Sequence, residues 1–411
     1  MPGPRVAYLL LWFPEPSQTF VLDEVNTLVR LGLDVRVYTL YGPRSAAATA
    51  GMAKVLAPVR HLGTAALPIL VRDRLRLGRT WGPEAAAFWR RVMVRRWSSL
   101  ETGGEALWAA LAGVHLAGVL TADGIDHIHA PWANGPATAA WVASRLSGLP
   151  FSFSGRAHDL YPPDGALAEK MAAAQFIRTN TRTNQRYLVE LCPHWAGKVV
   201  NVYNGVSLAP AAEAWRPARP PFQLLALGRL VPKKGFPVLL TACRLLQAQG
   251  VEVHLTLAGD GPERGKIREI IHREGLAPRV SLPGAVPHRE VARLMAGADL
   301  LVMPSLIAPS GDRDGIPNVI LEALLCAVPV VASAVSGIPE VIGDGDTGWL
   351  TAPGDPEALA RAVAAALADP EEARRRAERG REFVRQEFDS LRNYARLKVL
   401  LEGAARPHQE G

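Results

Sequence analysis

The sequence predicts an α/β protein built from two doubly wound parallel sheets. Short, continuously apolar runs recur along the chain, as expected for strands that are covered on both faces. Stretches of helical length separate these runs, and strand–helix alternation is typical of parallel sheets. The runs also form two series, before and after a proline- and alanine-rich stretch at 208–221. We therefore expect two domains joined by a linker.

The apolar runs give the expected strands in order. The first, VAYLLLWF at 6–13, resembles a signal-peptide core, but it continues into Pro-Glu-Pro rather than a small-residue cleavage site, which favours a buried strand. The expected strands are 6–13, 35–40, 125–130, 149–153 and 199–203, then 222–228, 253–259, 280–282, 300–304 and 328–332. The clearest expected helices are 236–249, 262–274, 288–297 and 356–379.

These series define the expected domains. We predict a Rossmann-like domain at 1–206, a linker at 207–221, a second Rossmann-like domain at 222–385 and a carboxyl-terminal segment at 386–411. Doubly wound sheets bind ligands beyond the carboxyl ends of their strands. Candidate site residues should therefore directly follow strands.

Composition narrows the possible classes of protein. The chain of 411 residues is 48% hydrophobic and 21% charged, which fits a globular protein with a large core. Cys192, Cys243 and Cys326 match no zinc or disulfide spacing and indicate a reducing, cytoplasmic compartment. No apolar run of about 18 residues lacks charge, so we expect no membrane-spanning helix.

Positive charge is concentrated in one stretch. The net charge is +7, and residues 71–97 carry eight arginines against two acids, an excess of +6. A helix over 85–97 would place Phe88, Trp89, Val92, Met93 and Trp97 on one half and Arg90, Arg91 and Arg95 on the other, with Arg96 between them. This composition is typical of a helix at an anionic membrane surface, whereas the alternative is a core helix with solvated arginines. The stretch contains no nucleic-acid-binding signature, so we expect no nucleic-acid partner.

The motif GRLVPKKG at 228–235 directly follows an expected strand. Glycine lets the backbone approach a ligand closely, while Arg229 and Lys234 supply positive charge. The motif therefore predicts a phosphate-binding loop, with a basic surface turn as the alternative.

The motif SGDRDGIPNVILEAL at 310–324 combines acids with a helix start. Pro317 suits the first helical turn, and the N–H groups around it are available to an anion. Glu322 lies about 7 Å further along the helix, where a carboxylate could accept hydrogen bonds from ribose hydroxyls. Asp312 and Asp314 could instead bind a divalent metal, but Arg229 and Lys234 supply the same charge, so we expect no metal.

Histidines follow strands in the first half of the chain. HIHAPWANG at 127–135 and SFSGRAHDLY at 152–161 contain His127, His129 and His158. No acidic or cysteine ligand accompanies them convincingly, so a core or cleft role is favoured over a metal site. His158 with Asp159 is the best candidate for acid–base chemistry or contact with a sugar hydroxyl.

Together these motifs resemble the GT-B glycosyltransferases of family four, which are retaining enzymes that use nucleotide sugars. The second half matches through GRLVPKKG, LAGDGP, VSLPGAV, DGIPNVILEAL, GIPEVI and GDTGWL, in the family's order over most of 222–350. The first half, through FPEPSQTFVLDEV, HIHAPWA, LSGLPFSFSGRAHDLY and NVYNGVSL, is similar to a branch found in exopolysaccharide, colanic-acid and lipopolysaccharide biosynthesis. Two departures are Ser17-Gln18-Thr19-Phe20 in place of a Gly-Gly loop, and Asp314 where the family more often has Glu.

The resemblance implies two domains that face each other across a cleft, with a final helix returning to the first domain. It also implies sugar transfer to a lipid-linked glycan without a cofactor, by an enzyme in the cytoplasm or at the inner face of the plasma membrane. Same-face attack and double displacement both remain open, and the rival functions are a sugar-nucleotide epimerase and a basic nucleic-acid-binding protein. The implied catalytic residues are His158, Asp314, Arg229 and Lys234; the donor-binding residues are Gly228, Arg229, Lys234, Val286, Asp314, Gly315, Ile316, Pro317, Asn318 and Glu322; the acceptor-side residues are Ser17, Thr19, His129 and Asn204.

Overall fold

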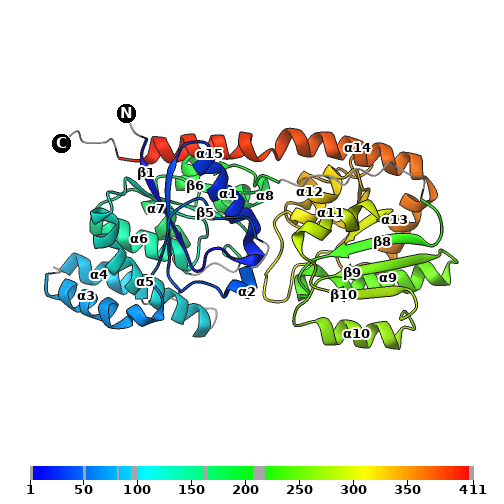
Figure 1. Ribbon diagram of the computed structural model, residues 1–411, viewed down its shortest axis with the longest axis horizontal. Helices are drawn as coiled ribbons and strands as arrows, with labels where there is room; N and C mark the ends of the chain where they lie inside the picture. The colour runs from blue at the N-terminus through cyan, green and yellow to red at the C-terminus, as the bar shows by residue number, and fades with distance from the viewer. Residues whose placement is uncertain are drawn as a thin grey trace. The chain divides into compact units, whose positions relative to one another are not determined.

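The computed structural model confirms the predicted fold class: two α/β units, each built on a parallel sheet (Figure 1). The structure describes residues 3–49, 52–80, 83–93, 100–161, 165–206 and 218–406. One compact unit comprises Met1–Gly205 and Ser390–Gly411, and the other comprises Val206–Asp389. Most of the expected linker lies outside the described residues.

The first unit contains a seven-stranded parallel sheet in the order β3-β2-β1-β4-β5-β6-β7. Its order reverses between β1 and β4, where Tyr8 is paired with His129. The strands are β1 (Arg5–Leu10), β2 (Asp34–Thr39), β3 (Val59–His61), β4 (His127–Ala130), β5 (Phe151–Gly155), β6 (Ile177–Thr179) and β7 (Val199–Asn201). The helices are α1 (Thr19–Arg30), α2 (Ala46–Thr49), α3 (Leu67–Thr80), α4 (Pro83–Met93), α5 (Leu100–Ala122), α6 (Gly135–Ser147), α7 (Leu167–Ala173), α8 (Arg182–Leu191) and α15 (Ser390–Ala404).

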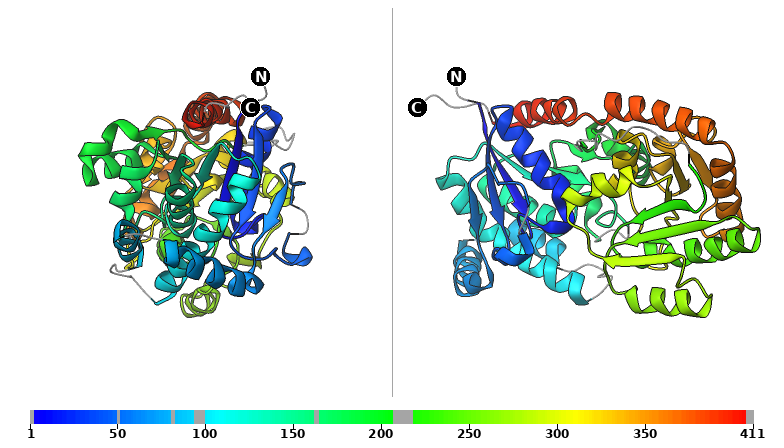
Figure 2. Two further views of the ribbon diagram at one scale, coloured as in Figure 1. Left: turned by 90° about the vertical axis from the view of Figure 1, so that its left-hand side faces the viewer. Right: turned by 45° about the vertical axis from the view of Figure 1, so that its right-hand side comes forward.

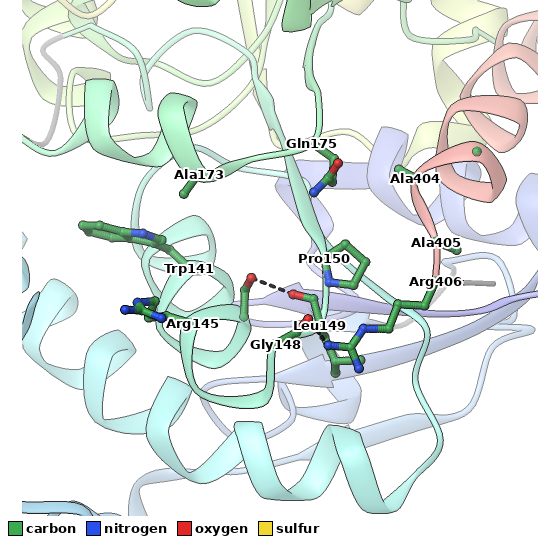
Figure 3. Close-up of a pocket in the computed structure, with 12 residues that line it drawn as sticks. Trp141, Arg145, Gly148, Leu149, Pro150, Ala173, Gln175, Ala404, Ala405 and Arg406 are labelled. Atoms are coloured by element: carbon green, nitrogen blue, oxygen red, sulfur yellow. Dashed lines mark hydrogen bonds between the residues drawn. The ribbon is translucent and has the colours of Figure 1, made fainter. Parts of the chain in front are cut away.

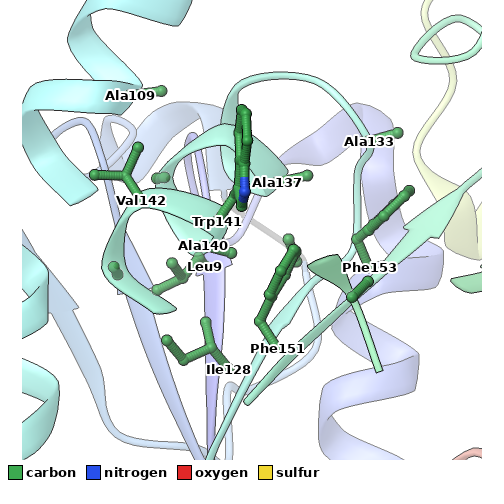
Figure 4. Close-up of a cluster of buried hydrophobic side chains, with 14 of the residues drawn as sticks. Leu9, Ala109, Ile128, Ala133, Ala137, Ala140, Trp141, Val142, Phe151 and Phe153 are labelled. Atoms are coloured by element: carbon green, nitrogen blue, oxygen red, sulfur yellow. The ribbon is translucent and has the colours of Figure 1, made fainter. Parts of the chain in front are cut away.

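Alternate side chains of β1 enter two different cores, which explains why its sequence is apolar without interruption. Ala7 and Leu9 join a cluster with α5, α6 and the neighbouring strands (Figure 4). Tyr8 and Leu10 point to the opposite face, where α1 and α15 complete the second cluster. Helices therefore cover both faces of the sheet, as the continuous apolar runs predict.

The second unit contains a six-stranded parallel sheet in the order β10-β9-β8-β11-β12-β13. Its order reverses between β8 and β11. The strands are β8 (Phe222–Leu227), β9 (Val253–Ala258), β10 (Val280–Gly284), β11 (Leu300–Met303), β12 (Val330–Ser333) and β13 (Trp349–Thr351). The helices are α9 (Phe236–Ala248), α10 (Arg264–Arg273), α11 (His288–Ala296), α12 (Asn318–Leu325), α13 (Pro356–Ala368) and α14 (Pro370–Glu387).

The structure corrects the expected elements in two respects. Strands β3, β6 and β13 were missed because each has only three residues, too few for a visible apolar run. The single helix expected at 356–379 is two helices, because Asp369 leaves the helical conformation before Pro370 and caps α14 by accepting the Glu372 N–H at 2.9 Å.

Helix α5 is long and apolar enough to cross a membrane by composition alone, although the sequence analysis expected no such helix. The apolar segment of this helix, Glu101–Ala122, is half buried inside the unit. Ala109, Ala112 and Leu116 lie in the same core as the strands. This packing is that of a core helix.

The described part of α4 buries the apolar half that was considered for membrane contact. Val92 is fully buried, and the Phe88 ring packs edge-on against Trp141 at 5.1 Å between centroids. The Trp89 ring lies 4.4 Å from the Arg74 guanidinium carbon. Phe88 and Val92 therefore pack toward the core, as the alternative expects, while Arg90 and Arg91 are exposed; Arg95, Arg96 and Trp97 lie outside the described residues.

The last helix, α15, belongs to the core of the first unit. Tyr394, Leu397 and Leu401 are fully buried against α1 and the sheet, and the Tyr394 hydroxyl accepts the Gly205 N–H at 3.1 Å. Figure 2 shows α15 beside α1 at one side of this unit. The first unit is therefore assembled from both ends of the chain.

We expect Leu397→Ala to lower the free energy of unfolding of the first unit by about 2–5 kcal/mol, because truncation of a buried leucine leaves a cavity. The matched control is Val399→Ala on the same helix, which is 67% exposed and should cost less than about 0.5 kcal/mol. Urea denaturation followed by tryptophan fluorescence measures both changes. Equal effects would contradict the burial of α15.

Candidate functional site

Most candidate residues of the second unit lie at the carboxyl edge of its sheet. β8 and β11 are neighbours, with Leu224 paired to Leu300, and the strand order reverses between them. Doubly wound proteins bind ligands beyond the carboxyl ends of the strands at such a reversal. The loops 228–235 and 304–317, which follow these two strands, are therefore the best placed for a ligand.

Backbone contact holds these two loops together at Gly235. A Cβ atom on Gly235 would lie only 1.9 Å from the Pro304 carbonyl oxygen. Its φ of 65° is also one that glycine adopts at least cost. Next to it, the Leu306 N–H donates to the Lys233 carbonyl at 2.7 Å. The loop that carries Lys233 and Lys234 thus has a fixed position.

Two lysines and two aspartates meet where the loops touch. Lys234 Nζ lies 2.8 Å from Asp314 Oδ2, a contact of charges rather than an aligned hydrogen bond. Lys233 Nζ lies 3.1 Å from Asp312 Oδ1 and 3.6 Å from Asp314 Oδ1. Burial raises the pKa of Asp314, but Lys234 and then Lys233 outweigh that effect, so the pKa lies below its usual value. Asp314 is therefore an anion at neutral pH.

These contacts are relevant to the alternative in which Asp312 and Asp314 bind a divalent metal. Each carboxylate already faces a lysine ammonium, which a divalent cation would have to displace. In the described parts of the chain, no group of three histidine, cysteine, aspartate or glutamate side chains could hold a metal. The positive charge of this site comes from its own lysines.

Helix α12 begins directly beyond these charges. Pro317 precedes the first helical residue, Asn318, rather than lying inside the first turn as expected. Gly315 and Pro317 are buried, while Ile316 and Asn318 are half-buried. Glu322 is only 9% exposed, and its neighbours Val319 to Leu324 on the same helix are apolar and buried.

The remaining donor-side candidates follow two other strands of the same sheet. Gly228 and Arg229 follow β8, and the Arg229 side chain is exposed. Val286 is half-buried in the loop between β10 and α11. These residues share the carboxyl edge of the sheet with Lys234, as the sequence predicts.

In the first unit, His158 lies in the loop after β5. The residue is exposed, and its ring packs against Trp132 with the centroids 4.6 Å apart. The neighbouring Asp159 is only 3% exposed and accepts the N–H groups of Ala133 and Ala157 at 2.7 and 2.8 Å. Asp159 therefore ties together the loops after β4 and β5, and does not share the acid–base role considered for the pair.

The acceptor-side candidates occupy different environments. Thr19 is exposed at the first residue of α1, and Ser17 lies in the short turn before it. Asn204 is half-buried after β7. His129, in contrast, is fully buried between Ser152 Oγ at 2.8 Å and Ser154 Oγ at 3.2 Å, and burial lowers its pKa to about 3.

A buried charge network lies beneath this edge, and sequence reasoning missed it. Glu24 is fully buried; it accepts hydrogen bonds from Arg156 at 2.8 Å, from Arg178, and from the Tyr8 hydroxyl at 3.2 Å. Both arginines also donate to Asn204 Oδ1, at 2.6 and 3.0 Å. The local sequence offers little signal, because Arg178 lies in the mostly polar stretch QFIRTN, where nothing marks it as buried.

Comparison with known proteins identifies the activity. Residues 212–383 match the model of the family described as glycosyl transferases group 1. The sequence is 26% identical, over 97% of this chain and 99% of the other, to a putative colanic acid biosynthesis glycosyltransferase of Salmonella typhimurium. The chain is a glycosyltransferase. A shorter segment is 40% identical, over 34% of each chain, to an amylovoran biosynthesis glycosyltransferase of Erwinia amylovora.

Solved structures share the fold of the glycosyltransferase. An Anabaena protein in complex with UDP matches with a TM-score of 0.69 at 20% identity, over 97% of this chain and 100% of that one. A sucrose-phosphate synthase from Thermosynechococcus elongatus matches with a TM-score of 0.70 at 20% identity, over 96% and 98% of the two chains. The GT-B fold predicted from the sequence is thereby confirmed.

The glycosyltransferase also has a pocket of about 570 Å³ in the first unit (Figure 3). It lies at the amino end of β5, opposite the edge that carries His158. The Ser144 hydroxyl donates to the Leu149 carbonyl at 2.6 Å beside it, and Arg406 donates to the Gly148 carbonyl. Because ligands of doubly wound sheets bind at the carboxyl edge, we assign no substrate to this pocket.

Glu24→Gln should make the first unit less stable and also less sensitive to acid. The folded pKa of Glu24, about 2, lies below its ordinary 4.5, because Arg178 and Arg156 outweigh burial. Its ionised form therefore stabilises the fold above pH 4.5, and this contribution, on the order of 3 kcal/mol, is lost as the pH falls toward 2. At neutral pH the variant should lose about 3–5 kcal/mol, because two buried arginines lose their partner.

Denaturation from neutral pH down to about pH 3 measures both effects. Glu402→Gln, which removes a half-buried pair with Lys398, is the matched control and should leave the acid dependence unchanged. If acid lowered the free energy of unfolding of Glu24→Gln as steeply as that of the wild type, the proposed role of the Glu24 network would be contradicted.

Proposed function

We propose that this glycosyltransferase transfers a sugar from a nucleotide-sugar donor to a lipid-linked glycan acceptor, with retention of configuration, in exopolysaccharide biosynthesis. The observation that carries the proposal is the meeting of Lys233, Lys234 and Asp314 directly before α12, at the reversal point of the second sheet. The Anabaena relative, solved with UDP and with UDP-glucose, supports the donor class. The colanic acid and amylovoran relatives support the pathway class.

Charge stabilisation of the leaving nucleoside diphosphate is the main chemical task. Lys234 is paired with Asp314. A diphosphate would compete with this carboxylate for the lysine, while the exposed Arg229 supplies a second cation. Preorganised cations of this kind stabilise the negative charge that develops as the sugar departs. Release of Lys234 would free Asp314 to accept hydrogen bonds from the donor sugar.

Glu322 suits the ribose of the donor. It lies on α12 about 7 Å beyond Pro317, further than a phosphate held at the helix start would reach. Its carboxylate has two acceptor oxygens and sits in an otherwise apolar helix, where two adjacent hydroxyl groups would be suitable donors. Val286, in the loop after β10, would contact the base through its backbone.

The first unit would supply the acceptor side. His158 is exposed after β5, and Thr19 is exposed at the start of α1. In this proposal His158 lies by the anomeric centre. The acceptor attacks the face of the sugar from which the nucleoside diphosphate leaves, and this gives retention. NMR of the first-formed product would distinguish retention from inversion. His129 would act only indirectly, because the sheet buries it.

The direct test is release of nucleoside diphosphate from a panel of nucleotide sugars that includes UDP-glucose, with and without glycan acceptors. Acceptor-dependent release from at least one donor is expected. Conversion of the donor sugar without an acceptor would favour the epimerase alternative, and failure to bind any nucleotide would overturn the proposal.

Glu322→Ala should raise the donor KM and lower kcat with the fold intact. The loss of a charged hydrogen-bond pair to ribose should cost about 2–3 kcal/mol in kcat/KM. Glu269→Ala is the matched control, because this side chain on α10 is 75% exposed. If Glu322→Ala had the same kcat and KM as the wild type, the assignment of Glu322 to the ribose would be wrong.

Transfer should survive exhaustive treatment with EDTA, because Lys234 and Arg229 supply the positive charge that a metal would bring. Initial rates before and after chelation, with manganese and magnesium added back, measure this. Complete loss that either ion restores would instead support metal binding by Asp312 and Asp314.

A further inference from the structure

Helix α3 has one face packed into the first unit and one face that protein does not cover. On the inner face, Leu70 is fully buried and Asp73 Oδ2 contacts His115 Nδ1 of α5 at 2.8 Å. The outer face presents Leu67, Val71 and Leu75, which are 47, 43 and 62% exposed. Their spacing of four residues places them on successive turns, so they form one aliphatic stripe. We call these three residues the outer stripe.

Arginines flank the outer stripe. At about 100° per residue, Arg72 and Arg76 fall on the solvent side of α3, and both are exposed. Arg90 and Arg91 of α4 are exposed in the same unit. The acid within this part of α3, Asp73, is turned inward to His115 and also contacts Arg72 at 3.1 Å. The outer half of α3 therefore combines exposed aliphatic side chains with positive charge.

We propose that the outer face of α3 docks onto an anionic lipid surface. An aliphatic stripe flanked by arginines is the pattern of a helix that lies in the headgroup region, with its apolar side chains toward the acyl chains. Arginine side chains are long enough to keep their guanidinium groups among lipid phosphates while the stripe inserts. A lipid surface fits better than a protein partner, because its charge complements Arg72 and Arg76 without requiring a matched apolar pocket.

This proposal places the membrane contact on α3, whereas the sequence analysis considered a helix over 85–97. There the aromatic half of 85–97 was the candidate, but Phe88 and Val92 pack into the core. The outer stripe is the apolar surface proposed instead. Arg90 and Arg91 of α4 contribute further exposed positive charge to the same unit. The inference goes beyond the proposed function, because it rests on the exposed side chains of α3 and its test measures vesicle binding rather than sugar transfer.

Vesicle co-sedimentation of the full-length protein tests the inference without any catalytic readout. We expect binding to vesicles of phosphatidylcholine with phosphatidylglycerol at low salt, and much weaker binding to phosphatidylcholine alone or at high salt. Arg72→Gln with Arg76→Gln should weaken binding about 25-fold, about fivefold for each arginine. Val71→Ser with Leu75→Ser should weaken it by about tenfold or more, because the stripe can no longer insert.

The matched control is Leu391→Ser with Val399→Ser on α15. These side chains are 57 and 67% exposed, but they lie two turns apart rather than on successive turns. Binding of this variant should equal that of the wild type, and the unfolding temperatures of all variants should stay similar. Absence of wild-type binding, or unchanged binding after Val71→Ser with Leu75→Ser, overturns the proposal. So does a wild-type dimer that these two substitutions dissociate, since the stripe would then be a self-association surface.

Discussion

The carboxylate of Glu24 holds together segments that are far apart in the sequence. It lies on α1 and accepts hydrogen bonds from Tyr8 on β1, from Arg156 after β5 and from Arg178 on β6. The arginines extend the network to Asn204 after β7. Each buried charge would be costly alone, and the mutual pairing offsets that cost. The position of the His158 loop depends on it, because Arg156 belongs to the same turn.

The second unit uses a related arrangement for a different purpose. Asp314 is also a carboxylate against two cations, Lys233 and Lys234. Its pairs are less complete, since Asp314 Oδ2 lacks an aligned hydrogen bond although Lys234 Nζ lies 2.8 Å away. A fully satisfied network such as that of Glu24 resists rearrangement, whereas an imperfect pair can exchange partners at low cost. In the proposed function, that difference would separate a scaffold from a site that binds and releases a charged ligand.

The sequence predicted the features that depend on local pattern. Continuous apolar runs reveal strands buried on both faces, and motifs such as GRLVPKKG and DGIPNVILEAL follow such strands, so these motifs were expected at the carboxyl edge of the second sheet, where the structure places them. The buried network was not predicted, because Glu24 and Arg178 meet only through long-range packing. His129 shows the same limit: it was expected to follow a strand, but it lies within β4, where the serines of β5 enclose it. Pattern locates an edge of a sheet, whereas burial of a single polar side chain is decided by its neighbours in space.

The return of α15 to the first unit has a consequence for biosynthesis. The ribosome makes residues 1–205 first, but Tyr394, Leu397 and Leu401, which close their core, emerge only after the whole second unit. Until then, the face of the sheet formed by Tyr8, Leu10 and α1 lacks part of its apolar cover. The second unit, continuous from 206 to 389, can meanwhile complete its own core. Synthesis from the amino terminus thus favours completion of the second unit before the first. Until α15 leaves the ribosome, the exposed apolar face of the first unit needs protection from aggregation.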